Sequence, residues 1–235
     1  MLTQLTHYLQ GITQLILPLQ CRGCGSDLVS EGAQLCALCT IALPETQYTP
    51  YPNNPVEKMF VGRVPIHAAT SMYYFNKNSL LQHLLHQLKY GGNQAIGVEL
   101  GTMLGTRLLV SHRYTQVDYI IPIPLSKKRQ QQRGYNQSLA ISNGIAASMQ
   151  VPVLDNLAIR QRDNETQTHK TRQERWENMQ NVFYSNNTNI IAHKHILLVD
   201  DVLTTGATLE ACAQALLQQC NCTISIATVA MASYL

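Results

Sequence analysis

The stretch that decides the fold of this 235-residue chain is HILLVDDVLTTGATLEAC, residues 195–212. It begins with a short apolar run at residues 196–199, which is typical of a strand buried on both faces. Beyond Gly206, apolar and small side chains recur at helical spacing, at Leu209, Cys212, Ala213, Leu216 and Leu217. The stretch therefore predicts a strand, a loop and a helix, the repeating unit of a parallel α/β sheet.

Two adjacent carboxylates, Asp200 and Asp201, stand where this strand meets the loop. Ligands of open parallel sheets bind at the carboxyl ends of the strands. The loop provides hydroxyls and helix-start N–H groups for an anion, at Thr204, Thr205, Gly206, Ala207 and Thr208. Carboxylates repel a bare phosphate, so the pair predicts a ligand that carries hydroxyls or a metal ion beside its phosphate. The alternative is an ordinary strand followed by a helix start that Asp or Thr caps.

The string LLVDDVLTTGAT, residues 197–208, resembles the ribose-phosphate motif of type I phosphoribosyltransferases. Those enzymes bind phosphoribosyl pyrophosphate (PRPP) together with magnesium. The resemblance implies that Asp200 and Asp201 contact the ribose hydroxyls and that residues 204–208 hold the 5-phosphate. It also implies attack of an acceptor on C1 of PRPP, with pyrophosphate leaving. Neither the catalytic residues nor the acceptor can be identified from the sequence.

A second segment, IIPIPLSKKRQQQRGYNQSLA at residues 120–140, resembles ComF-type competence proteins, which are relatives of the phosphoribosyltransferases. The match continues through Arg160, Arg162, Gln167, Arg175, Asn178 and Phe183. It includes four cysteines that follow a Leu-Pro pair, and so covers nearly the whole chain. Asn164 and Lys170 depart from the pattern, and they lie in a long polar stretch at residues 160–180.

Strands and helices alternate along most of the chain, which indicates a doubly wound α/β domain. We predict strands at 69–75, 117–123, 153–159 and 182–184, and helices at 80–88, 98–110 and 138–149. The fold class expected is α/β: a type I phosphoribosyltransferase-like parallel sheet flanked by helices, with a small N-terminal four-cysteine zinc module. The predicted divisions are a zinc-binding module at 1–45, a linker at 46–66 and the phosphoribosyltransferase-like domain at 67–235.

Two C-x-x-C knuckles predict a structural zinc site at Cys21, Cys24, Cys36 and Cys39. Four thiolates leave no open coordination position, so the metal has no catalytic role. A redox dithiol or two unrelated motifs are the alternatives. The three later cysteines, Cys212, Cys220 and Cys222, are expected to be buried free thiols.

A basic segment follows the predicted strand at 117–123, and we expect a loop there. Leu125, Ser126, Lys127 and Arg129 are the candidates to hold pyrophosphate. Lys127, Lys128, Arg129 and Arg133 are candidates for contacts with single-stranded DNA. A solvated basic loop is the alternative. Arg133, Tyr135, Asn136 and Gln137 suit either ligand contact or helix capping, and Lys89 with Tyr90 either reaches the site or caps a helix.

Two functions therefore stay open: a phosphoribosyltransferase with an unknown acceptor, or a protein that binds PRPP, DNA or a partner without turnover. The resemblance implies a role in DNA uptake during natural transformation, with competence-machinery proteins among the partners. The first twenty residues lack the early basic residues of a signal peptide, and we read them as an amphipathic helix ending at Pro18. The expectation is a cytoplasmic protein without membrane insertion.

Overall fold

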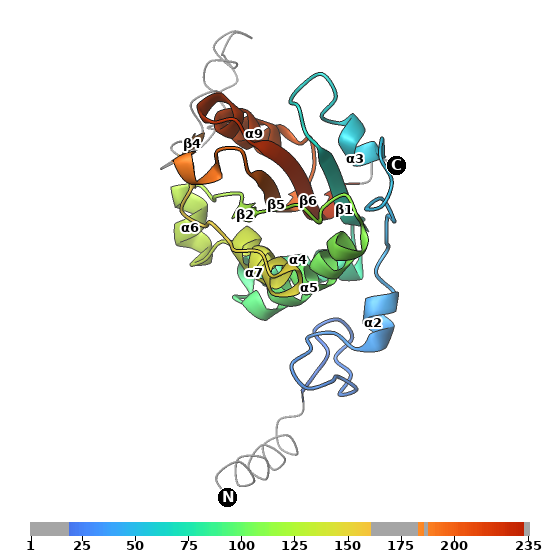
Figure 1. Cartoon of the computed structure of the whole chain (residues 1–235). Coiled ribbons are helices and arrows are strands. Elements are labelled where there is room, and N and C mark those ends of the chain that lie inside the picture. The colour runs from blue at the N-terminus through green and yellow to red at the C-terminus, as the bar shows by residue number, and fades with distance from the viewer. Residues whose placement is uncertain (1–18, 161–182, 186–187, 233–235) are drawn as a thin grey trace, which may run out of the picture.

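The main sheet has four parallel strands in the order β1-β6-β5-β2 (Figure 1). Their bounds are β1 (Ala68–Phe75), β2 (Tyr119–Pro122), β5 (His195–Leu203) and β6 (Thr223–Ala232). This computed structural model describes residues 19–160, 183–185 and 188–232. The sheet confirms the predicted parallel α/β architecture. Asp200 and Asp201 lie inside β5, because the strand continues to Leu203 instead of ending at the acidic pair.

Helices cover both faces of the sheet (Figure 1). One face carries α4 (Leu80–Tyr90), α5 (Gln94–Val110) and α7 (Gln137–Met149), and the other carries α3 (Pro55–Lys58) and α9 (Ala207–Gln219). Strand β5 supplies both cores, with Leu197 and Val199 in one cluster and Leu198 in the other. This double burial explains the continuous apolar run, since neither face of the strand meets water.

Helices α5 and α7 approach each other closely because glycines stand at their contact. A Cβ atom added at Gly101 would lie 2.0 Å from the carbonyl oxygen of Ile141, and one at Gly144 would lie 2.0 Å from that of Val98. No larger side chain fits either position unless the helices separate. The contact fixes α7 on the sheet, and the first turn of α7 carries Ser138.

The predicted basic loop is wrong, because residues 127–133 form helix α6 (Lys127–Arg133). The Ser126 hydroxyl caps its start by accepting from the Arg129 N–H, and Gly134 ends it in the left-handed conformation with φ 74°. Lys, Arg and Gln all have good helix propensity, so cap signals and propensity agree along this segment. The helices predicted at 80–88, 98–110 and 138–149 are present with ends shifted by up to four residues.

Most of the predicted strand at 153–159 is also absent. Asp155 and Asn156 form a turn, and only β3 (Ala158–Arg160) follows, paired antiparallel with β4 (Phe183–Ser185) in a separate two-stranded sheet. Val153 instead makes one parallel bridge to Ile120 at the edge of the main sheet. A 3₁₀ helix, η1 (Thr188–Ile191), precedes β5.

Residues 46–66, the predicted linker, pack against the main sheet. Val56 and Phe60 are fully buried, and the Asn54 side chain caps α3 while donating 2.9 Å to the Ala69 carbonyl oxygen of β1. The four-cysteine segment contains α2 (Ala37–Ile41) and shares a core with helix α4, since Cys21, Cys36 and Cys39 join the same cluster as Leu81 and Leu84. The domain divisions at 45 and 66 stay a prediction.

Candidate functional site

The acidic pair lies near the carboxyl end of β5, and other elements supply its partners. Asp201 is buried at 6% exposure, whereas Asp200 is partly exposed as a residue. The Ser138 hydroxyl, at the start of α7, donates 2.9 Å to Oδ1 of Asp200. Burial, and then the neighbouring charge of Asp201, raises the pKa of Asp200 to about 7. Two carboxyl groups are thus held together where a second negative charge is unfavourable.

Lys89, in the last turn of α4, contacts this pair. Its Nζ lies 2.8 Å from Oδ2 of Asp201, and 23% of its side chain is exposed. The contact is an ion pair and not a hydrogen bond, because Oδ2 of Asp201 accepts no hydrogen bond from the described residues. Lys89 of the LKYGG motif therefore lies at the site, which is one of the two alternatives that the sequence leaves open.

The loop after β5 joins the strand to helix α9. Gly206 adopts φ 76° and caps α9, so an L-residue there would be strained, and its added Cβ would lie 3.1 Å from the ring of Phe60. The N–H groups of the residues after Gly206 lie in the first turn of α9, so no preceding helical turn supplies carbonyl oxygens to accept them. Together with Thr205 and Thr208 they surround a hollow of about 30 Å³. The loop has the donors and the shape that suit a small anion.

Arg63 contacts this loop, and no motif in the sequence predicts that contact. Its guanidinium donates 3.0 Å to the carbonyl oxygen of Thr205 and pairs with Glu210 of α9. The same group lies 5.9 Å from the ring centroid of Phe60. Nothing near residue 63 signals the contacts with Thr205 and Glu210, because these partners lie 142 and 147 positions further along the chain.

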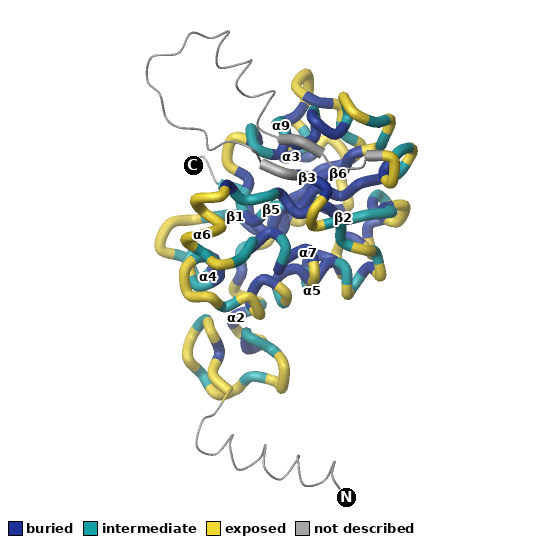
Figure 2. The backbone as a smooth tube through the Cα atoms, turned by 90° about the vertical axis from the view of Figure 1, so that its left-hand side faces the viewer, coloured by how far each residue is buried: buried dark blue, intermediate teal, exposed yellow. Residues whose placement is uncertain are grey.

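The predicted pyrophosphate segment lies beside the acidic pair because β2 and β5 are neighbours. The Ile123 N–H donates 2.8 Å to the carbonyl oxygen of Val199, so the chain after β2 leaves the sheet next to Asp200. Leu125 is half-buried, and Ser126 is buried as a helix cap. Exposed backbone marks much of α6 in Figure 2. Lys127, Lys128 and Arg129 of this helix are exposed, and within the described ranges they form no ion pair.

Residues 133–137, at the end of this segment, mostly cap helices or pack against neighbouring elements. Asn136 caps α7 by accepting from the Ser138 N–H, and it donates 3.0 Å to the Ile123 carbonyl oxygen. The Tyr135 hydroxyl donates to the carbonyl oxygen of Leu88. Arg133 lies 5.3 Å from the ring centroid of Tyr90. Capping and packing therefore account for Tyr135 and Asn136. Within the described ranges, Nη1 of Arg133 and the amide oxygen of Gln137 are buried without a hydrogen-bond partner.

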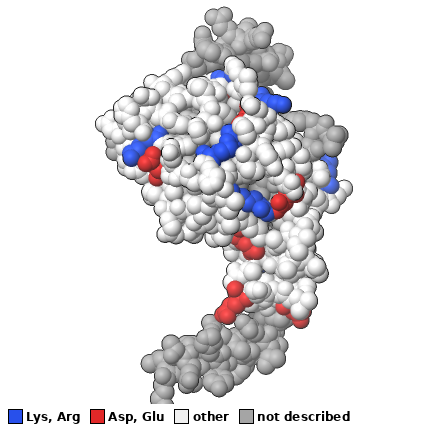
Figure 3. All heavy atoms as spheres, turned by 45° about the vertical axis from the view of Figure 1, so that its right-hand side comes forward, with Lys and Arg blue, Asp and Glu red and all other residues white. Residues whose placement is uncertain are grey.

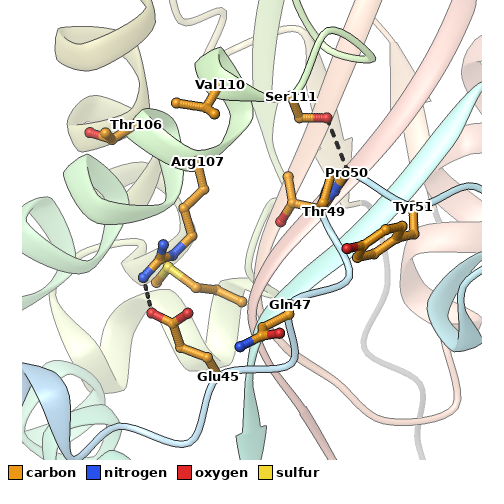
Figure 4. A pocket seen from close by; sticks show the side chains of 10 residues that line it. Glu45, Gln47, Thr49, Pro50, Tyr51, Thr106, Arg107, Val110 and Ser111 are labelled. Atoms are coloured by element: carbon orange, nitrogen blue, oxygen red, sulfur yellow. Dashed lines mark hydrogen bonds and ion pairs between the residues drawn. The ribbon is translucent and has the colours of Figure 1, made fainter.

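Two larger cavities lie outside the hollow at 204–208. A cavity of about 660 Å³ borders the basic helix and is lined by Leu125, Lys127, Asn136, Asp155 and Asn156, among others. A second, of about 380 Å³, lies between residues 45–51 and the end of α5, with the Arg107–Glu45 ion pair at one side (Figure 4). Glu45 bridges to Tyr73 of the edge strand β1, so this second cavity lies at the β1 edge of the sheet, whereas Asp200 is on β5.

The four cysteines of the two knuckles come together. Their sulfur atoms all lie within 4.8 Å of one another, and the Cys24 and Cys36 sulfurs are 3.8 Å apart. Tetrahedral zinc with bonds of about 2.3 Å requires sulfur separations of about 3.8 Å. Burial works to raise the pKa of Cys21, but N–H donors, that of Cys36 foremost, outweigh it and lower the pKa to about 6. The cluster suits a structural zinc ion.

The three cysteines outside the knuckles differ in burial. Cys212 is fully buried, whereas Cys220 and Cys222 are only partly buried, although all three were expected to be buried.

The basic side chains on the face that Figure 3 shows lie in small groups, several of them beside acidic side chains, and form no continuous patch. None of the helices in the described ranges is both long and apolar enough to cross a lipid bilayer.

Several predicted features lie outside the described residues. These are the N-terminal helix, most of the polar stretch at 160–180, and the residues Arg162, Asn164, Gln167, Lys170, Arg175 and Asn178.

Residues 136–233 match the family described as phosphoribosyl transferase domain. Competence protein F of Haemophilus influenzae is 35% identical over 43% of this chain and 44% of its own length. DNA utilization protein YhgH of Salmonella typhi is 31% identical over 62% of this chain and 65% of its own length. The chain thus spans less than two thirds of either relative.

Competence protein ComFC of Bacillus subtilis is 24% identical over 85% of this chain and 78% of its own length. Among solved structures, a glutamine PRPP amidotransferase from B. subtilis complexed with ADP and GMP aligns at a TM-score of 0.43 and 14% identity. That alignment covers 61% of this chain and 30% of the amidotransferase chain.

Proposed function

Because the chain is a homologue of the competence and DNA utilization proteins and carries a phosphoribosyl transferase domain at residues 136–233, we propose that it binds PRPP with magnesium at the carboxyl end of β5. Asp200 and Asp201 contact the ribose hydroxyls, and residues 204–208 hold the 5-phosphate. Leu125, Ser126, Lys127 and Arg129 face the pyrophosphate. The biological role that goes with this site is DNA uptake in natural transformation.

One observation carries this proposal: an acidic pair and a loop rich in N–H and hydroxyl donors adjoin a basic segment at one sheet edge. The pair alone would favour a cation, and the loop alone a phosphate. PRPP requires both, since its ribose hydroxyls donate hydrogen bonds to carboxylates and its phosphates need donors. Magnesium suits the carboxylate oxygens and would neutralise part of the pyrophosphate. The raised pKa of Asp200 supports the same view, because a bound cation relieves the crowded negative charge.

Calorimetry of PRPP binding with and without magnesium tests the proposal. Replacing both Asp200 and Asp201 by Asn keeps side-chain size and removes charge, and we expect a loss of affinity of tenfold or more, about 1.4 kcal/mol. Asp118→Asn is the matched control, since Asp118 lies beside the opposite end of β5 and accepts from the His195 N–H. Unchanged PRPP affinity in the double variant would overturn the role of the pair.

Turnover is a separate step of the proposal. A phosphoribosyltransferase needs a cavity for its acceptor, and the cavity of about 660 Å³ beside Lys127 has the size of small-molecule sites. We therefore propose that an acceptor enters there. Pyrophosphate release on addition of candidate acceptors measures this directly. PRPP binding without release in any acceptor mixture would favour a binding protein over an enzyme.

Exposed Lys127, Lys128 and Arg129 favour a second candidate function, binding of single-stranded DNA. Neutralised phosphates release counterions, so affinity should fall as salt rises, with little dependence on sequence. Replacing the three residues by Ala should weaken binding and flatten that salt dependence. If DNA and PRPP share the segment, PRPP will compete with DNA in an anisotropy titration. No DNA binding at low salt excludes this function.

A further inference from the structure

The last turn of α4 contacts three separate parts of the molecule with four consecutive residues. The Gln87 side-chain amide donates 3.0 Å to the carbonyl oxygen of Arg22, inside the first cysteine knuckle. Leu88 accepts from the Tyr135 hydroxyl through its carbonyl oxygen, and Tyr90 lies under Arg133. Lys89 pairs with Asp201. One rigid turn therefore joins the knuckle, the end of the basic segment and the acidic pair.

The knuckle also contacts the first residue of the same helix. A Cβ atom added at Gly23 would lie 2.8 Å from the Cys39 sulfur and 2.8 Å from Cδ1 of Leu80. Arg22 and Gly23 are the two residues between Cys21 and Cys24, so a metal ion on these cysteines fixes the backbone that α4 touches. Without the ion, no metal–sulfur bonds hold the four sulfur atoms within 4.8 Å of one another.

Lys89 controls the charge of the acidic pair. Asp201 is buried, and in the described part of the chain Lys89 is the only cation that pairs with it. Withdrawal of the ammonium group would leave two adjacent carboxylates without compensation, and these would repel the phosphates of an incoming ligand. The position of Lys89 thus bears on ligand affinity although the residue belongs to another element.

We infer that the last turn of α4 couples the cysteine knuckle to the acidic pair, so that a metal ion on the four cysteines strengthens PRPP binding at β5. This inference rests on the proposed PRPP site. Gln87 and Lys89 act as positioning residues, because the one holds the turn to the knuckle and the other orients and neutralises Asp201. Coupling between two sites is reciprocal, so PRPP must strengthen metal binding by the same factor.

Calorimetry on the full chain tests the coupling, with PRPP and magnesium titrated into zinc-loaded protein and into protein from which zinc has been removed. We expect PRPP affinity at least about fivefold weaker without zinc. Competition with a chromophoric chelator then measures zinc affinity with and without PRPP. This second measurement starts from loaded, folded protein, so it decides the question even if the zinc-free chain unfolds.

Two variants locate the path. Gln87→Ala leaves all four cysteines in place, and we expect its zinc-dependent change in PRPP affinity to fall below about twofold. Glu99→Gln is the control, because the Glu99 carboxylate accepts from the Gln34 and Leu35 N–H groups and docks the knuckle on α5, away from the acidic pair. It should retain the full wild-type effect.

The outcomes separate the two proposals. If PRPP does not bind zinc-loaded wild type, the proposed function fails, and the inference fails with it. If PRPP binds with the same affinity with and without zinc, only the coupling is overturned. The same holds if zinc affinity is unchanged by PRPP. If Glu99→Gln loses the effect as fully as Gln87→Ala, docking of the knuckle in general is responsible and the path through α4 is wrong.

Discussion

Asp200 and Asp201 are neighbours in the chain, yet different elements hold their carboxyl groups. Asp200 accepts from Ser138 at the start of α7, and Asp201 pairs with Lys89 at the end of α4. A buried pair of like charges is stable only with such compensation. Each aspartate therefore has one side-chain partner from a distant helix, and those partners lie 62 and 112 positions away in sequence.

His195 provides a residue-scale prediction about pH. Burial, and then the nearby His67, lowers its pKa to about 4. Its ring nitrogen lies 2.8 Å from the Ser225 hydroxyl. The unfolded chain takes up the proton near pH 6.5 and the folded chain only near pH 4, so stability falls as pH drops through that interval, by up to about 3 kcal/mol.

Urea titrations from pH 7 to pH 4, on wild type and on His195→Gln, check this contribution. The variant should lose part of the acid sensitivity, while His193→Gln, at an exposed histidine, should not. The raised pKa of Asp200 acts with the opposite sign over an overlapping interval, so the difference between the two proteins is the quantity to compare. Parallel stability curves would contradict the assignment.

At the scale of elements, the contact between α5 and α7 positions the site. Gly101 and Gly144 let the two backbones meet, and α7 then presents Ser138 to Asp200. Helix α6 belongs to the same scale, since it replaces an expected loop and places three basic side chains in solvent on one short helix. Element packing thus decides which polar groups surround the ligand.

Gly101→Ala should therefore destabilise the protein, although alanine has the higher helix propensity by about 1 kcal/mol. The added methyl group would lie 2.0 Å from a backbone oxygen, which cannot move aside as a side chain can. We expect a loss of about 1–3 kcal/mol in chemical denaturation. Gly105→Ala, whose nearest neighbour is the Ser148 side chain at 2.8 Å, should cost less. Equal or greater stability of Gly101→Ala would refute the close contact.

At the scale of the whole molecule, the cysteine segment and the sheet share one core. Cys21, Cys36 and Cys39 join a cluster that reaches through Leu84 and Leu100 to Val199 of β5. The segment lies apart from the sheet in Figure 1, yet its buried side is continuous with the helical layer. Loss of metal should accordingly affect more than the knuckles alone.

We predict about one zinc ion per chain, by elemental analysis of protein purified without chelator. Removal of the ion should lower the melting temperature of the whole chain, because the knuckles and helix α4 unfold together. Cys39→Ser should do the same, whereas Cys220→Ser, at a partly exposed thiol that donates to the Leu216 carbonyl oxygen, should retain the zinc. Well-folded protein without zinc would contradict the site.

The sequence by itself determined the local features of this protein. The apolar run before Asp200, the glycine before α9 and the cysteine spacing each depend on residues within one or two elements, where periodicity and cap chemistry act. The same rules predicted the alternation of strands and helices. Cap signals and helix propensity also favour a helix at residues 127–133, so the loop predicted there is wrong against these same local rules.

Only the tertiary structure decided which elements meet. The strand order β1-β6-β5-β2 places the end of β2 beside Asp200, and a parallel sheet of the same strands in another order would separate them. The contacts of Lys89 with Asp201 and of Arg63 with the 204–208 loop likewise join residues more than 100 positions apart. Such contacts follow from long-range packing, which no periodicity or motif along the chain encodes.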